Sequence, residues 1–102
     1  MERFKNVDIV TKANIYYDGK VTSRTVYLGE ERKTLGFMMA GEYVFNTQAA
    51  ETMEVLGGSI LVKQNGQEEK VYKEGEVFHV PANSSFTAVV ETYADYCCSY
   101  GE

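Results

Sequence analysis

The run GEVFHVPANSSF, residues 75–86, carries the clearest signal of the fold in this sequence. Its segment VFHV alternates bulky β-forming residues in the way of a half-buried strand. Pro81 then ends the pairing because proline has no amide hydrogen to donate, and the polar residues 83–85 favour a turn. A second β-forming run begins at Phe86 and continues to Val90. The stretch therefore predicts a strand, a turn and another strand.

Short β-forming segments recur outward from this run at intervals of about 8–12 residues, with turn signals between them. Asp18-Gly19 and Asn65-Gly66 are hairpin dipeptides, Gly41 is expected to end a strand, and Gly57-Gly58 to form a turn or a bulge. Residues 1–12 read as a lead-in edge strand, and 13–17 as an apolar stretch. No segment holds a helical period, so the pattern predicts an all-β sandwich or barrel. The expected strands after the lead-in are 20–28, 32–40, 42–47, 51–56, 59–63, 68–72, 77–80, 86–90 and 93–100.

Composition narrows the class of protein. A chain of 102 residues suffices for one small domain, and its formal net charge of -5 argues against nucleic acid as a partner. No apolar run approaches the roughly 20 residues of a membrane span, and the charged N-terminus lacks the apolar core of a signal peptide, so we expect a cytoplasmic protein without membrane contact. Cys97 and Cys98 are adjacent and would point to opposite faces of a strand. We interpret them as small hydrophobic residues, with a reactive thiol or a metal site as the alternative.

The spacing of Gly75, Pro81 and Phe86 resembles the second motif of the cupin superfamily. This resemblance implies an all-β, single-domain cupin (RmlC-like) over residues 1–102, folded as an antiparallel β-barrel or jelly roll. Metal-binding cupins carry a histidine where Phe86 stands, and the two histidines of their first motif fall here on Phe45 and Thr47. Only Glu51 remains of the four ligands.

A metal ion needs several ligands that converge on one point, so we expect no metal in the cup. A rival interpretation is a metal-dependent cupin enzyme that uses Glu51, Glu54 and His79 as ligands. His79, however, alternates with Phe78 and Val80, so its side chain is expected to point away from the core.

A basic cluster on the expected hairpin is a candidate anion site. Arginine offers a planar fork that matches phosphate, and hydroxyl groups such as that of Ser23 complete such a site. The alternative is a solvated hairpin with scattered charges. The cluster consists of Lys20, Arg24, Arg32 and Lys33.

Glu51 and several aromatic residues are candidates for the interior of the cup. A buried carboxylate needs partners, either an internal arginine that fixes the fold or the hydroxyl groups of a ligand. Aromatic rings can stack on nucleobases with little regard to base identity, although core packing is the alternative for each ring. The aromatic candidates are Tyr43, Phe45, Phe86 and Tyr96.

Six motifs together resemble the pyrimidine/purine nucleoside phosphorylases of the small bacterial cupin type, formerly a domain of unknown function. The resemblance covers residues 14–100. The motifs are YYDGKVTSRT (16–25), RKTLG (32–36), GEYxFxT (41–47), ExM (51–53), GxxFxVPxxxSF (75–86) and YxCxY (96–100).

The resemblance implies phosphorolysis, in which a purine or pyrimidine nucleoside and inorganic phosphate give the free base and pentose 1-phosphate. Cationic side chains must then hold phosphate beside the anomeric carbon. Arg24, Arg32 and Lys20 are expected to do so, and Glu51 to bind ribose. The base would lie against an aromatic ring. No side chain is evident as the general acid that would protonate the leaving base.

We expect no cofactor, and a homodimer, as in many cupins. The alternative is a non-enzymatic cupin that binds a metabolite in the same cup without turnover.

Overall fold

The computed structural model of the chain describes residues 3–101, which form one antiparallel sheet of eight strands. Along the sheet the strands follow the order β1-β3-β4-β8-β5-β6, while β2 pairs with β3 and β7 with β5. The bounds are β1 Asp8–Ile9, β2 Asn14–Tyr16, η1 Tyr17–Gly19 (a 3-10 turn), β3 Val21–Leu28, β4 Glu31–Asn46, β5 Glu51–Gln64, β6 Lys70–Lys73, β7 Val77–Val80 and β8 Ser85–Tyr100. The all-β prediction is confirmed.

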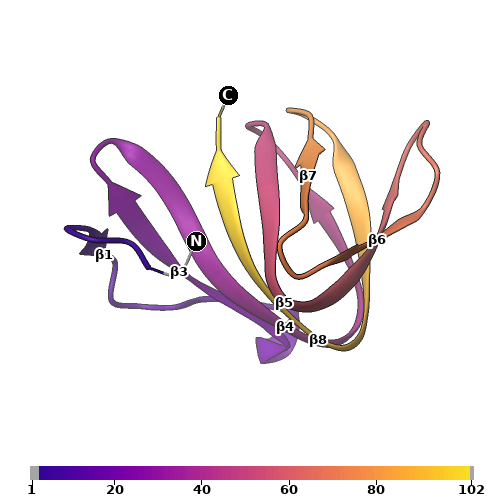
Figure 1. Cartoon of the computed structure of the whole chain (residues 1–102), viewed down its shortest axis with the longest axis horizontal. Helices are drawn as coiled ribbons and strands as arrows, with labels where there is room; N and C mark the ends of the chain where they lie inside the picture. Colours follow the sequence, from indigo (N-terminus) through magenta and orange to yellow (C-terminus); the bar gives the residue numbers. More distant parts are fainter. Residues whose placement is uncertain (1–2, 102) are drawn as a thin grey trace.

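Three long strands, β4, β5 and β8, bend together into a cup (Figure 1). The register between β4 and β8 shifts at Met39/Gly41, and that between β5 and β8 shifts at Val55/Gly57 and at Gly58/Leu61. Such irregularities increase the bend of a strand without ending it. The expectation that Gly41 ends a strand was therefore wrong, whereas the bulge at Gly57-Gly58 is confirmed. For the same reason, 86–90 and 93–100 are one continuous strand, β8.

The cup is a jelly-roll sheet rather than a closed barrel. Within residues 3–101, β1 and β6 end the strand order and do not pair with each other. Both are short, with two and four residues. The expected lead-in edge strand is thus reduced to Asp8–Ile9, which pairs with Val26 and Tyr27 of β3.

The turn predicted from residues 81–85 is held from outside by Thr47. The Thr47 hydroxyl donates to the Pro81 carbonyl at 2.7 Å and accepts from the Ser84 amide at 3.0 Å. This turn connects β7 to the start of β8, where the Phe86 side chain is buried in the core. Thr47 therefore serves the fold at a position where metal-binding cupins place a ligand.

A row of aromatic rings leads from the exposed Tyr17 into the buried core of the cup. Neighbouring ring centroids along this row lie between 4.9 and 6.3 Å apart. In order, the rings are those of Tyr17, Tyr43, Phe45, Phe86, Phe78 and Tyr72. Within the described part of the chain, no helix has the length and apolar character needed to cross a membrane.

Candidate functional site

A cavity of about 140 Å³ lies inside the cup, walled by β2, β3, β4, β5 and β8. Five of the residues predicted to form the site line it: Ser23, Phe45, Glu51, Phe86 and Tyr96. The remaining lining residues are Tyr16, Thr34, Met38, Asn46, Met53, Cys98 and Tyr100.

Cys98 and Tyr100 are two of the cavity residues that sequence reasoning missed. Alternate residues of a strand share a face, so β8 directs Tyr96, Cys98 and Tyr100 into the cavity together. The spacing YxCxY contained this signal. It was missed because a cysteine in a terminal strand was interpreted as a small hydrophobic residue.

Glu51 is the carboxylate of the cavity. It opens β5 opposite Tyr100, while Cys98 lies diagonally across the strand pair, opposite Met53. Burial raises the pKa of the Glu51 carboxyl above its ordinary value, and a hydrogen bond with Cys98 and the charge of Arg32 oppose that rise. The carboxyl therefore occupies a half-buried position in the wall of the cavity.

Tyr100 lies opposite Glu51 in the strand pairing and contacts the neighbouring strand β4. Its hydroxyl lies 3.1 Å from the Thr34 hydroxyl on β4, and its ring lies under Arg32, whose guanidinium carbon is 3.9 Å from the ring centroid. Burial raises the pKa of Tyr100, so its hydroxyl is neutral near pH 7. Arg32, Thr34, Tyr100 and Glu51 together form a polar wall with cationic, neutral and acidic groups.

The opposite wall is aromatic. Phe45 and Phe86 face each other with centroids 5.4 Å apart, in the places where metal-binding cupins carry histidines. Tyr43 lies outside the lining and packs beside Phe45 with its ring buried. The Tyr43 hydroxyl donates to the Met39 carbonyl at 2.7 Å, which ties the ring to the bulge of β4.

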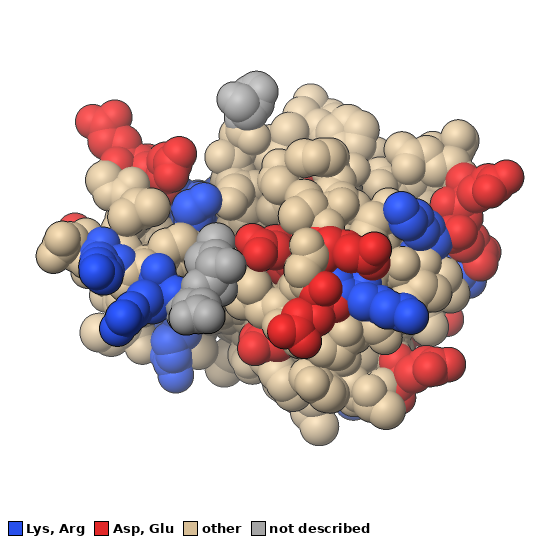
Figure 2. Space-filling view, in the orientation of Figure 1, with Lys and Arg blue, Asp and Glu red and all other residues tan. Residues whose placement is uncertain are grey.

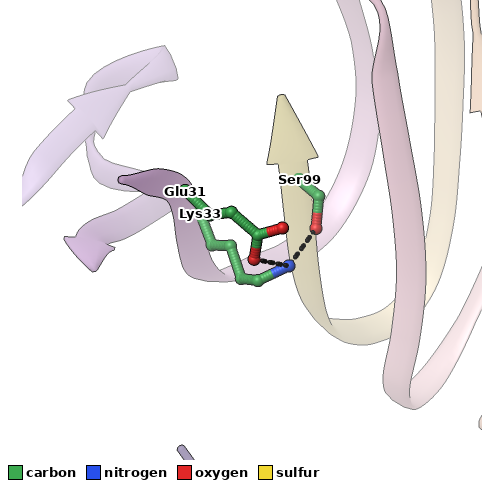
Figure 3. Close-up of polar contacts among 3 residues, drawn as sticks. All are labelled: Glu31, Lys33 and Ser99. Atoms are coloured by element: carbon green, nitrogen blue, oxygen red, sulfur yellow. Dashed lines mark hydrogen bonds and ion pairs between the residues drawn. The ribbon is translucent and has the colours of Figure 1, made fainter. Parts of the chain in front are cut away.

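The hairpin cations are divided between the two faces of the sheet. Arg32 lies beside the cavity, but Arg24 points to the outer face, where its Nη1 donates to the Thr11 carbonyl at 2.7 Å. Lys33 extends along the outside to the Ser99 hydroxyl at 2.8 Å and to Glu31 at 4.0 Å (Figure 3). Lys20 is exposed just before β3. The structure thus places Arg32 over Tyr100 in the wall of the cavity, and does not bring the other three cations there.

The charges are nevertheless unevenly distributed. Seven of the ten Lys and Arg residues fall in positions 1–33, and ten of the fifteen Asp and Glu residues follow them. Figure 2 shows the basic side chains gathered at the end of the molecule that holds β1 and β3, whereas acidic side chains prevail over the rest of this face. An anion approaching that end meets a locally positive surface on an acidic protein.

The rival set of metal ligands is not assembled. Among residues 3–101, no group of three His, Cys, Asp or Glu side chains is placed to hold a metal ion. Glu51 faces the cavity, while the next side chain of β5, Thr52, lies on the other face, 3.1 Å from Nδ1 of the exposed His79. The alternation of β5 places Glu54 on that outer face as well.

The model of the pyrimidine/purine nucleoside phosphorylase family matches residues 11–100. The chain belongs to this family. A pyrimidine/purine nucleoside phosphorylase from Syntrophotalea carbinolica is 57% identical over 102 residues, which cover 98% of each chain. The similarity to this family therefore covers nearly the whole sequence.

Solved structures share the fold of this chain. A protein from Acinetobacter sp. ADP1, described as a DUF1255 protein of unknown function, superimposes with a TM-score of 0.91 at 30% identity, covering 96% of this chain and 97% of the other. An RmlC-like cupin from Shewanella frigidimarina gives a TM-score of 0.70 at 20% identity, covering 96% and 86%. The latter similarity shows the cupin fold alone.

Proposed function

We propose that this protein is a nucleoside phosphorylase, a pentosyltransferase that acts on both purine and pyrimidine nucleosides. The observation that carries the proposal is the full-length similarity, at 57% identity, to a relative of that name. The cavity supports it with the three kinds of group that phosphorolysis needs: a cation for phosphate, an acceptor for sugar hydroxyls and an apolar face for the base.

In the proposed reaction, an oxygen of inorganic phosphate forms a bond to the anomeric carbon as the bond from that carbon to the base nitrogen breaks. The base leaves with the electron pair of that bond and then takes up a proton. Arg32 holds the phosphate, assisted by the hydroxyls of Thr34 and Tyr100, because a guanidinium group matches phosphate geometry and stays charged. Positioning the nucleophile in this way removes much of the entropic part of the barrier.

Glu51 accepts hydrogen bonds from the ribose hydroxyls, and the base lies against the aromatic wall of Phe45 and Phe86. Contact with the face of a base does not read its edge, which accounts for a broad choice of nucleosides. Ser23 and Tyr96 complete the lining on the sugar side. Lys20, Arg24 and Tyr43 lie off the cavity, so the proposed contacts with substrate rest on the lining residues and Arg32.

The decisive experiment measures release of free base from a panel of nucleosides with and without phosphate. Release that requires phosphate and yields pentose 1-phosphate is the expected result, whereas nucleoside binding without turnover would favour a metabolite-binding cupin. Arg32→Ala should raise the KM for phosphate roughly ten- to hundredfold, the cost of one charge-assisted contact. Arg24→Ala, an arginine variant on the outer face, should change it much less. The reverse ranking would place phosphate elsewhere.

We also propose a cytoplasmic homodimer. Cys97 and Cys98 are both free and buried, which suits a reducing compartment. The outer face of the sheet carries a cluster of exposed apolar side chains, Phe37, Met39 and Tyr93, hereafter the outer patch. The outer patch is suited to meeting its own copy across a twofold axis.

A further inference from the structure

Tyr16 and Asn46 mark the open side of the cavity, hereafter the mouth. They are the exposed residues of the lining, whereas the other lining residues are half-buried or buried. Tyr16 ends β2 and Asn46 ends β4, so the two stand on different strands. The cavity of about 140 Å³ is smaller than the roughly 300–1,000 Å³ of most ligand pockets. A nucleoside bound there must therefore extend into the mouth.

Tyr17 ties the two sides of the mouth together. It follows Tyr16 directly, and its hydroxyl donates to the Val44 carbonyl and accepts from the Val44 amide at 3.0 Å. The pairing of β3 with β4 ends at Met38, so Val44 lies on a stretch of β4 that β3 does not cover. The Tyr17 hydroxyl thus bonds to this edge as a neighbouring strand would, two residues before Asn46.

The backbone after β2 directs the two adjacent tyrosines differently. Tyr17 and Asp18 have φ angles of 52° and 56°, in the left-handed region that residues with a Cβ rarely adopt. The Tyr17 ring packs with its centroid 5.1 Å from that of Tyr43 and 6.0 Å from that of Phe45. Tyr16, by contrast, lines the cavity. Backbone strain of this kind persists where surrounding contacts hold it, and it is frequent at ligand sites.

We propose that Tyr16 and Asn46 contact the nucleobase where it emerges from the cavity, and that Tyr17 is a positioning residue that sets their separation. This inference rests on the nucleoside site proposed above, in which the base lies against Phe45, the neighbour of Asn46 in β4. The Tyr16 ring covers the face of the base, whereas the Asn46 amide offers both donors and an acceptor to its edge. Asn46 therefore sets the preference among bases.

The chain offers a matched control for each substitution. Tyr17→Phe removes the hydroxyl and both bonds to Val44 but keeps the ring. Tyr27→Phe makes the same change at an exposed tyrosine of β3 outside the cavity lining. Asn46→Ala removes the amide at the mouth, and Asn65→Ala removes one at an exposed position between β5 and β6.

The first measurement does not depend on activity. Exchange of the Val44 amide hydrogen is followed by NMR with and without saturating inosine, in the absence of phosphate so that no phosphorolysis occurs. Bound inosine should slow this exchange at least about threefold in wild type, because a base held between both sides of the mouth stabilises the bond that joins them. Exchange that bound inosine leaves unchanged would overturn the inference.

The variants separate this effect from general stability. Without ligand, Tyr17→Phe should speed exchange of the Val44 amide at least about tenfold, and Tyr27→Phe should leave it unchanged. Equal exchange in the two variants would contradict the role of Tyr17. If Tyr17→Phe does not fold, the response of wild type to inosine and its loss in Asn46→Ala decide the matter.

The second measurement is kinetic and uses inosine and uridine as a purine and a pyrimidine. Asn46→Ala should raise the KM for these nucleosides roughly two- to tenfold, the range for one hydrogen bond, with the KM for phosphate unchanged. The ratio of kcat/KM for inosine to that for uridine should change at least about twofold in Asn46→Ala, because an edge contact is lost. Tyr17→Phe should raise both KM values and keep the ratio. A ratio in Asn46→Ala equal to that in Asn65→Ala would refute the role of Asn46.

The two measurements also separate this inference from the proposed function. Slower Val44 exchange with inosine, in a protein without phosphorolysis, would support the contacts at the mouth and refute the proposed function. Phosphorolysis with neither slower exchange nor a changed ratio would do the opposite. A protein that binds neither inosine nor uridine would refute both.

Discussion

At the scale of single residues, the main feature of the cavity is the Glu51 carboxyl, whose burial disfavours the charged form. Burial is the largest effect on Glu51 and raises its pKa, so the folded chain binds this proton more tightly than the unfolded chain. The fold thus bears the cost of burying a charged carboxylate at Glu51, the residue that we propose binds the ribose hydroxyls. Proteins often carry local strain of this kind at functional sites.

The raised pKa of Glu51 gives a pH-dependent prediction for Glu51→Gln. Below the ordinary carboxyl pKa of 4.5, the group is protonated in both states and the substitution should change stability little. As pH rises from 4.5 through the raised folded value, wild type loses stability while the glutamine variant does not. Thermal unfolding should therefore show a gain in Tm for Glu51→Gln at pH 7 that is absent at pH 4. Glu54→Gln, on the outer face of β5, is the control, and an equal gain there would show that the effect is not specific to the cavity.

At the scale of strands, close pairing of β4 with β8 sets the position of a cavity wall. Gly36 lies directly opposite Tyr96, and the Tyr96 ring covers it so closely that a methyl group on Gly36 would overlap the ring. Tyr96 is 6% exposed and has little room to move aside. The glycine therefore fixes where Tyr96 enters the cavity.

Replacing Gly36 by alanine should push the Tyr96 ring out of its place. Overpacking of this kind costs typically about 1–3 kcal/mol of unfolding free energy, and here it should also reduce nucleoside binding, because the displaced ring lines the cavity. Chemical denaturation and nucleoside titration measure the two effects. Gly57→Ala is the matched control in β5, since an added methyl group there meets nothing closer than 3.6 Å. Equal losses in both variants would mean that contact with Tyr96 is not the cause.

The strands also show how far the sequence predicts this molecule. Period-two alternation and turn residues sufficed for most strands, and the resemblance to cupin motifs for the inward direction of Glu51, Phe45 and Phe86. They could not tell that Gly41 lies within a strand, because a bulge and a strand end use the same residue. Nor did they assign Arg24 and Arg32 to opposite faces: the expected strands 20–28 and 32–40 leave three residues between them, whereas the hairpin turn has two and pairs Leu28 with Glu31. One residue of register decides which face a side chain takes.

At the scale of the whole molecule, the two faces of the bent sheet carry different features. The inner face encloses the cavity, whereas the outer face of β4 and β8 carries the outer patch. Phe37 and Tyr93 stack there with centroids 5.8 Å apart and planes 13° from parallel, and Met39 pairs with Tyr93 across the strands. These three side chains are 43–53% exposed, an unusual amount for neighbouring large apolar groups.

Substitution of the outer patch should separate the proposed dimer. A twofold axis through the patch would place each Phe37 and Met39 near its own copy, so Phe37→Glu or Met39→Glu would set like charges against each other in the interface. Sedimentation equilibrium should show a dimer for wild type and a dissociation constant raised at least about tenfold in either variant, the effect of losing a central contact. Val71→Glu adds the same charge at an exposed valine of β6, which ends the strand order two strands beyond β8, and should leave the dimer intact. Since the patch lies on the face away from the cavity, the separated subunits should keep a folded nucleoside site. A monomeric wild type at high concentration, or variants that associate as tightly as Val71→Glu, would exclude the outer patch as the interface.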